Sequence, residues 1–393
     1  MADRFIVKRW GAMGLAAMLC LAGWGSTAWA APSGPPSCQC EGRLLMDAAT
    51  GQVLYNEHGY RQMDPASLTK MMTAYLVIRA GHLDRVVTVS RRAASTEGSR
   101  LHIREGQRYT VLDLLRGLLM RSGNDAATQL AEYEAGSVPA FADRMNQAAR
   151  RLGAYNTHFV NPHGLTAPGH YTSAYDLALI ARAALKLPVF QHLVSTPTDW
   201  VDELSRHRRR VLSNTNPLLE SFPAADGVKT GTTSAAGRCV VASATRDGTQ
   251  LIAVILKSRD RFGDAARLLG WGFSTFQRRT VIRAGERLGA IRVTRGMRGT
   301  VPIVALRGVS VLAPAGERPT VTLATESALP APVMRGRWVG LASTFLGGEP
   351  VGTVAVVAGD SVARAYSPRA WWDRLLGRIR RLFVSRRTAG TPS

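Results

Sequence analysis

Apolar residues recur along this chain with two different periods, one typical of helices and one typical of strands. Residues 64–81 carry apolar side chains every three or four positions and end at Gly81, which predicts a helix. Similar helical patterns occupy residues 111–121, 125–135, 138–153 and 174–187. Residues 259–276 predict one further helix.

Short apolar runs bounded by turn residues predict strands on both sides of these helices. Residues 42–58 indicate a hairpin, and residues 226–232, 237–246 and 249–257 indicate strands joined by tight turns. We therefore expect an α+β fold in which the first and last strands meet in one antiparallel sheet covered by helices. From about residue 276 the pattern changes to short alternating strands, which predicts a small all-β domain.

The N-terminus has the pattern of a signal peptide. Basic residues, among them Arg4 and Lys8, precede a short apolar segment, and small residues stand at Ala28 and Ala30. The apolar segment is short for a membrane span, so we expect cleavage after Ala30 and export to the periplasmic face of the cytoplasmic membrane.

The C-terminal tail predicts an amphipathic helix that starts at Pro368. Its apolar positions are Trp372, Leu375, Leu376, Ile379, Leu382 and Phe383, and its arginines Arg374, Arg378 and Arg381 lie on the other side. This pattern favours a helix lying in the interface of an anionic membrane. Docking of the helix on its own protein stays open. The expected domains are residues 1–30, 31–275, 276–365 and the anchoring tail 366–393.

The composition shows a large excess of basic over acidic residues. The formal net charge is +22, from 50 basic and 28 acidic residues. Such a charge suits a polyanion or an anionic membrane, but no nucleic-acid-binding motif is present, so nucleic acid is not an expected partner. The chain has only five lysines, and the other basic residues are arginines. Because lysine is rare in this chain, a lysine at a given position indicates a specific role more strongly than an arginine would.

Cysteine and histidine positions do not predict a metal site. After export, Cys38, Cys40 and Cys239 remain, and the compartment permits a disulfide, although three thiols cannot all pair internally. We interpret them as structural residues. A second group consists of His158, His163 and His170, whose spacing fits no familiar metal site.

The segment "SLTK" is the first candidate for chemistry. Positions three apart share a helix face, so Ser67 and Lys70 can bring a hydroxyl and an amine within reach. A serine becomes nucleophilic when a neighbouring base takes its proton, and lysine can be that base if its pKa is lowered. The alternative is that Asp64 or Ser67 caps the helix.

Two further patterns strengthen a catalytic interpretation. "SGN" places Ser122 and Asn124 between two helical segments, where they can hold a substrate or act as an N-cap. "KTG" places Lys229 and Thr230 on a strand, where a cation and a hydroxyl suit a carboxylate. Gly231 would let a peptide backbone approach closely.

The order SxxK, SxN, KTG, together with the words "DPASLTKMMTAY", "NPHGLTAPGHYTSAYDLALIA" and "DGVKTGTTSAAGRCVVASATRDG", resembles the low-molecular-mass penicillin-binding proteins that act as D-alanyl-D-alanine carboxypeptidases. The resemblance covers roughly residues 40–273 and extends into the β domain and tail. It implies helices on a five-stranded antiparallel sheet, then a β-sandwich and a membrane-anchoring helix.

The resemblance also implies roles for the motif residues. Ser67 would attack the peptide bond between two terminal D-alanines of a peptidoglycan stem, with Lys70 as general base and Ser122 as proton relay. The backbone amides of Ser67 and Thr232 would form an oxyanion hole. The substrate-binding residues would be Asn124, Lys229, Thr230, Gly231 and Thr232. β-Lactams would act as covalent inhibitors, and neither a cofactor nor a metal is implied.

Two positions depart from the pattern of the family. Close relatives often carry histidine where this chain has Thr232, which puts the rate of deacylation in doubt. For the arginine that helps bind carboxylate in some members, Arg259 is the nearest candidate in the sequence.

Three alternatives to a carboxypeptidase remain. A D,D-endopeptidase of this group generally lacks the added β domain and anchor. A class A β-lactamase would need a Glu-x-x-x-Asn element between SxN and KTG, which is missing here. A non-catalytic peptidoglycan-binding protein would be expected to have lost at least one motif residue.

Overall fold

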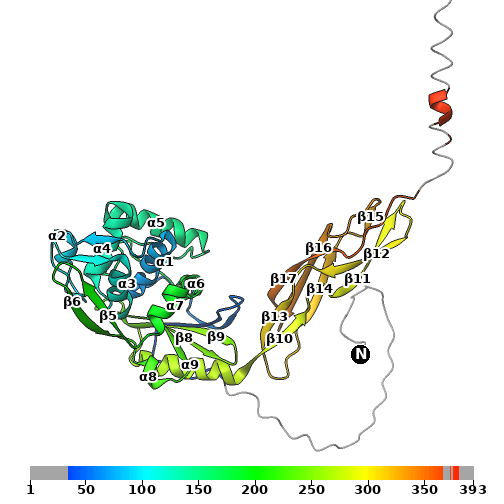
Figure 1. The fold of residues 1–393 in the computed structure, drawn as a ribbon. Coiled ribbons are helices and arrows are strands. Elements are labelled where there is room, and N and C mark those ends of the chain that lie inside the picture. Colours follow the sequence, from blue (N-terminus) through cyan, green and yellow to red (C-terminus); the bar gives the residue numbers. More distant parts are fainter. Residues whose placement is uncertain (1–33, 366–371, 373–374, 380–393) are drawn as a thin grey trace, which may run out of the picture. The chain divides into compact units, whose positions relative to one another are not determined.

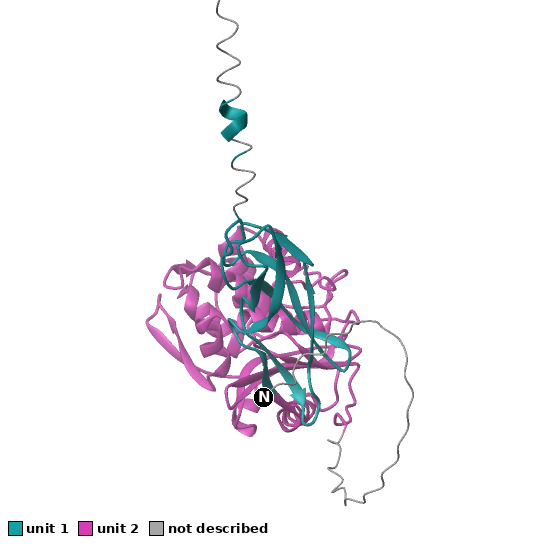
Figure 2. Cartoon of the chain, turned by 90° about the vertical axis from the view of Figure 1, so that its right-hand side faces the viewer, with its two compact units in different colours: residues 1–23, 278–393 teal, residues 24–277 magenta. Residues whose placement is uncertain are grey.

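The computed structural model describes residues 34–365, 372 and 375–379. The chain divides into two compact units between Gln277 and Arg278. In chain order, the first unit is magenta in Figure 2 and the second unit is teal. The predicted signal peptide lies outside the described residues. The predicted tail helix falls largely outside them too, although Trp372, Leu376 and Ile379 are described and exposed.

The first unit is built around a five-stranded sheet in the order β2-β1-β9-β8-β7 (Figure 1). All neighbouring strands are antiparallel, and the sequence-distant β1 and β9 pair at its centre. The strands are β1 (Gly42–Asp47), β2 (Val53–Glu57), β7 (Ala225–Thr233), β8 (Gly237–Arg246) and β9 (Thr249–Leu256). The predicted sheet is therefore confirmed.

Helices cover both faces of this sheet. On one face, Leu44 and Met46 of β1 join a large apolar core with the helices that follow. On the other face, Leu45 lies against Gly272, which belongs to the last helix of the unit. The helices are η1 (Ala66–Thr69), α1 (Lys70–Ala80), α2 (Arg91–Ala94), α3 (Val111–Met120), α4 (Asn124–Ala135), α5 (Val138–Arg151), α6 (Ala174–Ala184), α7 (Pro188–Ser195), α8 (Leu218–Ser221) and α9 (Arg261–Thr275).

The longer predicted helices are present, and side-chain caps fix where several of them begin. Thr110 accepts a hydrogen bond from the amide of Asp113 at the start of α3, and Ser173 does the same for Asp176 at the start of α6. Among the described residues, no single helix is long and apolar enough to cross a membrane, whereas the bent pair α6 and α7 meets that test by length and composition alone.

Two small two-stranded sheets were not predicted from the apolar pattern. They pair β3 (Val86–Thr88) with β4 (Arg108–Thr110), and β5 (Thr198–Glu203) with β6 (Arg208–Ser213). Their short strands carry many polar residues, so the signal of a buried strand is weak. The hairpin of β5 and β6 packs against α3, the helix that leads into the SGN segment.

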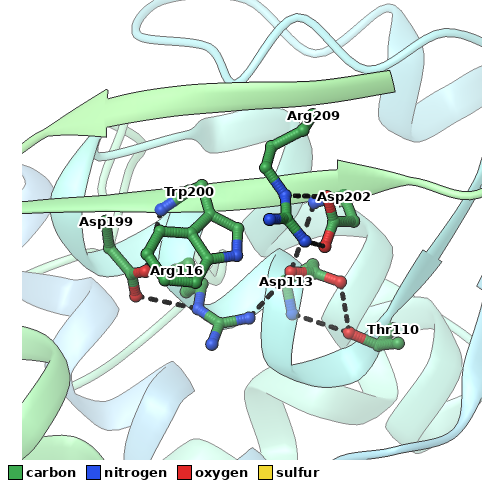
Figure 3. Close-up of polar contacts among 7 residues, drawn as sticks. All are labelled: Thr110, Asp113, Arg116, Asp199, Trp200, Asp202 and Arg209. Carbon is green, nitrogen blue, oxygen red and sulfur yellow. Dashed lines mark hydrogen bonds and ion pairs between the residues drawn. The ribbon is translucent and has the colours of Figure 1, made fainter. Parts of the chain in front are cut away.

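A buried ion-pair network fastens this hairpin to α3 (Figure 3). Arg116 of α3 donates to Asp199 of β5 through Nε and to Asp113 through Nη1, both at 2.9 Å. Asp113 also accepts from the hydroxyl of Thr110 at 2.5 Å. The carboxylates of Asp113 and Asp199 are almost fully buried, so they depend on the guanidinium for compensation.

Removing that guanidinium should destabilise the first unit. We expect Arg116→Ala to lower the free energy of unfolding by about 3 kcal/mol, because two buried carboxylates lose their cation. The matched control is Arg209→Ala, which breaks the exposed Arg209–Asp202 pair and should cost less than about 1 kcal/mol. Urea unfolding of both variants measures the difference, and equal losses would contradict the assignment.

The second unit is all-β, as the sequence predicts. A six-stranded sheet has the order β14-β16-β17-β12-β11-β15, and β10 pairs with β13. Val301, Ile303, Val339 and Val356 lie at the centre of its separate apolar core. The strands are β10 (Phe276–Ile282), β11 (Arg287–Thr294), β12 (Thr300–Ala305), β13 (Val309–Pro314), β14 (Thr320–Thr325), β15 (Ala328–Pro330), β16 (Trp338–Leu346) and β17 (Glu349–Ala358).

Candidate active site

Ser67 and Lys70 lie together at the start of the central helix. Ser67 belongs to the short helix η1, and Lys70 is the first residue of α1. The ammonium Nζ of Lys70 donates to Ser67 Oγ at 2.8 Å, to Asn124 Oδ1 at 2.7 Å and to the carbonyl oxygen of His163 at 2.7 Å. Pro65 and Thr69 occupy the cap positions without a side-chain cap bond, so the alternative that Asp64 or Ser67 caps the helix is wrong.

The environment of Lys70 favours its neutral form. Its side chain is fully buried, and this desolvation holds the pKa well below its ordinary value. The positive charge of Lys229 lowers the pKa further, while the carboxylate of Asp125 acts in the opposite direction. A neutral amine at hydrogen-bond distance from Ser67 Oγ can accept the hydroxyl proton, as a base for a serine nucleophile must.

The SGN segment lies at the junction of α3 and α4, beside this amine. Ser122 is buried and adopts a left-handed backbone conformation with φ of 59°. Asn124 opens α4, and its Nδ2 donates to the carbonyl of Glu97 at 2.6 Å while its Oδ1 faces Lys70. Gly123 holds the cap position of α4 without a side-chain bond, so Ser122 is not an N-cap.

The KTG segment lies on β7, the edge strand next to η1. Lys229 is buried, and desolvation together with the charge of Arg261 lowers its pKa to about 7. The hydroxyl of Thr230 lies 3.1 Å from that of Thr215. A Cβ at Gly231 would come within 3.0 Å of the backbone nitrogen of Ser67. Glycine therefore allows the strand to approach the turn that carries Ser67.

Arg261 contacts the KTG segment, although the sequence analysis did not single it out. It opens α9, and its Nη1 donates to the carbonyl of Gly231 and to Thr232 Oγ1, both at 2.7 Å. Arg259, the nearest candidate in the sequence, lines a different pocket together with Cys40 and its neighbours, and in the described part of the chain no contact between it and the KTG segment is found. Nothing in an arginine-rich sequence distinguishes two arginines separated by one residue, so only the fold could select between them.

Thr232, the residue directly after KTG, takes part in the same contact. Its hydroxyl accepts the hydrogen bond from Arg261, which ties the exposed end of the KTG strand to the start of α9. A pocket of about 360 Å³ opens beside Arg261 and is lined also by Thr215, the partner of Thr230. Arg261 thus faces open space at this end of the strand, whereas Lys229 is buried behind it.

The histidines act as structural residues. The main-chain carbonyl of His163 accepts from Lys70, and His170 Nε2 lies 3.0 Å from the hydroxyl of Thr69. Burial lowers the pKa of His163 to about 3 and that of His170 to about 4, so both are neutral near pH 7. Among the described residues, no group of three or more His, Cys, Asp or Glu side chains could hold a metal ion.

The cysteines divide into one disulfide and one thiol. Cys38 and Cys40 are bonded to each other, whereas Cys239 is free and buried. Cys239 pairs with Gly231 across β7 and β8, and burial raises the pKa of its thiol to about 11. It is therefore a small apolar core residue behind the KTG strand.

The fold and the arrangement of these side chains define an acyl-serine type of site, in which a buried lysine adjoins a serine next to an edge strand. The family "D-alanyl-D-alanine carboxypeptidase" matches residues 30–260, and the domain "Penicillin-binding protein 5, C-terminal domain" matches residues 276–364. The first match spans more than half of the chain, and the chain belongs to that family.

Named relatives agree with this assignment. The chain is 34% identical over 370 residues to D-alanyl-D-alanine carboxypeptidase DacC of Escherichia coli, covering 89% of this chain and 91% of the relative. It is 31% identical to DacF of Bacillus subtilis, covering 83% and 87%. The crystal structure of penicillin-binding protein 5 from Haemophilus influenzae superimposes with a TM-score of 0.74 at 30% identity, covering 84% of this chain and 99% of that one.

The close approach at Gly231 can be tested directly. Gly231→Ala places a Cβ against the turn that carries Ser67, and we expect acylation of Ser67 to slow by roughly 10-fold, because the turn must shift by a few tenths of an ångström and a shift of about 1 Å costs about 100-fold. The control is Gly270→Ala in α9, where a Cβ meets no atom within 4 Å. Stopped-flow acylation by a chromogenic penicillin measures both. Unchanged acylation in the first variant would show that β7 tolerates the extra carbon.

Proposed function

We propose that this chain is a serine-type carboxypeptidase that removes the terminal D-alanine from pentapeptide stems of peptidoglycan through an acyl-enzyme on Ser67. The observation that carries the proposal is the 2.8 Å contact between Ser67 Oγ and the fully buried amine of Lys70. Membership of the D-alanyl-D-alanine carboxypeptidase family supports the same activity.

Acylation begins when neutral Lys70 takes the hydroxyl proton of Ser67. The oxygen of Ser67 attacks the carbonyl carbon between the two D-alanines, and the backbone amides of Ser67 and Thr232 stabilise the resulting oxyanion. When the tetrahedral intermediate collapses, the C–N bond breaks and the nitrogen of the leaving D-alanine takes a proton. Ser122, buried beside Asn124 at the start of α4, relays that proton.

Substrate binding uses the charged end of the KTG strand. The terminal carboxylate of the stem lies near Lys229, Thr230 and Arg261, where two cationic side chains and a hydroxyl converge. Asn124 holds a substrate amide. Gly231 lets the substrate backbone approach the strand.

Water then hydrolyses the ester on Ser67 and releases the shortened stem. β-Lactams acylate the same serine and act as covalent inhibitors. The D,D-endopeptidase alternative is less favoured, because such relatives generally lack the added β domain that this chain carries at residues 276–364. The absence of a Glu-x-x-x-Asn element likewise disfavours a β-lactamase, and the intact lysine contacts disfavour a purely binding role.

We also propose that the protein is exported by its signal peptide and lies on the periplasmic face of the cytoplasmic membrane. The amphipathic arginine-rich tail, residues 366–393, would anchor it peripherally to anionic lipids. The exposed side chains of Trp372, Leu376 and Ile379 support this placement. Sedimentation with anionic vesicles tests this placement: the full-length protein should bind, and a chain that ends at Ala365 should bind much more weakly.

The activity is tested with a pentapeptide that ends in D-Ala-D-Ala. We expect the protein to release free D-alanine, and Ser67→Ala to release none above the uncatalysed rate, because no other hydroxyl is held against Lys70 Nζ in the described part of the chain. Coupled D-amino acid oxidation measures the release. Absence of release from folded wild-type protein would refute the proposed activity, and release by the variant would refute the nucleophile.

The pH dependence of kcat/KM follows from the two buried lysines. Lys70 must be neutral to act as base, so activity rises as pH passes its lowered pKa. Lys229 must be charged to hold the carboxylate, so activity should fall as pH rises through about 7. Because arginine stays protonated, Lys229→Arg should move this alkaline limb above pH 9 at a lower maximum rate. If kcat/KM of the variant falls at the same pH as in the wild type, the loss of activity at high pH belongs to a group other than Lys229.

A further inference from the structure

One end of the β unit combines exposed methionines with arginines at the point where the tail departs. The loop between β11 and β12 contains Met297, which is 73% exposed, and the segment after β15 contains Met334, which is 66% exposed. Most large apolar side chains of this unit lie in its core instead. Figure 1 shows the chain leaving the unit at this end of β11 and β15.

Backbone contacts hold these segments next to one another. The amide of Met297 donates to the carbonyl of Ala363 at 2.8 Å, and Gly296 forms a bridge with Arg364. Val333, directly before Met334, forms a second bridge with Val362. We call the exposed surface of residues 295–298, 334–335 and 363–365 the tip.

The tip carries unbalanced positive charge. Arg298 forms an ion pair with Asp360 at 3.5 Å, which neutralises the one acidic residue beside it. Arg295, Arg335 and Arg364 are exposed and form no ion pair among the described residues. Fixed cations around two protruding apolar side chains match a bilayer surface, where anionic headgroups lie above hydrocarbon.

The position of the tip limits its distance from the membrane. The predicted tail helix starts at Pro368, so residues 366–367 alone separate it from Ala365, a span of roughly 10 Å when extended. A helix in the interface lies about 5–10 Å below the headgroup boundary. The arginines of the tip therefore come within about one Debye length of the lipids.

We propose that the tip is a second membrane contact, which binds anionic lipid headgroups through Arg295, Arg335 and Arg364 and seats Met297 and Met334 among them. The proposal rests on the membrane placement proposed above. It adds a function to the β unit: two separate contacts, tail and tip, fix the unit's orientation on the bilayer, whereas a helix anchor alone would let it swivel.

The test is binding of the full-length protein to vesicles of equal parts phosphatidylglycerol and phosphatidylcholine, measured by sedimentation. Replacing Arg295, Arg335 and Arg364 together by Gln should weaken binding roughly 100-fold, at about five-fold per arginine. The matched control replaces Arg283, Arg287 and Arg307 by Gln, which removes the same charge at the opposite end of β11 and β12 and should change binding by less than about three-fold. Equal effects of the two triple variants would overturn the proposal.

A second measurement reports contact without removing charge. Met297→Cys, labelled with an environment-sensitive fluorophore, should shift to the blue on anionic vesicles, whereas labelled Leu306→Cys at the other end of β12 should not. The native thiol Cys239 is buried and should not react with the label. A label at Met297 that stays in water on membrane-bound protein would overturn the proposal even if the arginine variants fold poorly.

Failure of the tip and failure of the proposed function give different results. If the full-length protein binds vesicles, the chain ending at Ala365 does not, and the tip variants bind like wild type, then the tail anchor stands and the tip proposal is refuted. Release of D-alanine from a soluble pentapeptide is measured on every variant and should be unchanged, because the substitutions lie in the second unit.

Discussion

The catalytic unit depends on the complete burial of one amine. Removing the ammonium of Lys70 from water is costly unless it finds hydrogen-bond partners or loses its proton, and the structure provides for both. Its acceptors come from three separate segments: Ser67 in η1, Asn124 at the start of α4 and the carbonyl of His163 in a loop. The amine is fully hydrogen-bonded only when all three segments are in place.

Two glycines hold the turn that carries the nucleophile between a strand and a loop. On the strand side, Gly231 lets β7 come within contact of the backbone of Ser67. On the loop side, Gly164 has a φ of +91°, and a Cβ there would overlap the carbonyl oxygen of Ala66. Any other residue at Gly164 would face both a strained backbone and a clash. The position of Ser67 is thus set by close backbone approach as much as by its contact with Lys70.

The sequence predicted the elements that have a local apolar pattern and the features that the family resemblance implies. Apolar period alone located α3 to α6 and the strands of the central sheet, since each buries a long continuous face. The convergence of Ser67, Asn124 and Lys229 was predicted from resemblance, because no local pattern states which distant segments meet. Arg261 was missed because its role depends on where α9 starts relative to β7, a relation that only the folded sheet defines. The hairpin of β5 and β6 was missed because its strands are mostly polar and exposed.

The burial of two lysines accounts for part of the uneven use of lysine and arginine in this chain. Of the lysines in the described part of the chain, Lys186 and Lys257 are exposed, and Lys257 forms an ordinary ion pair with Glu41 that an arginine could replace. Lys70 and Lys229 are the buried ones, and both have lowered pKa values. A guanidinium would stay protonated in either place. At position 70 lysine supplies an amine that can lose its proton and act as a base, which arginine cannot do, whereas Lys229 has to stay charged to hold the substrate carboxylate.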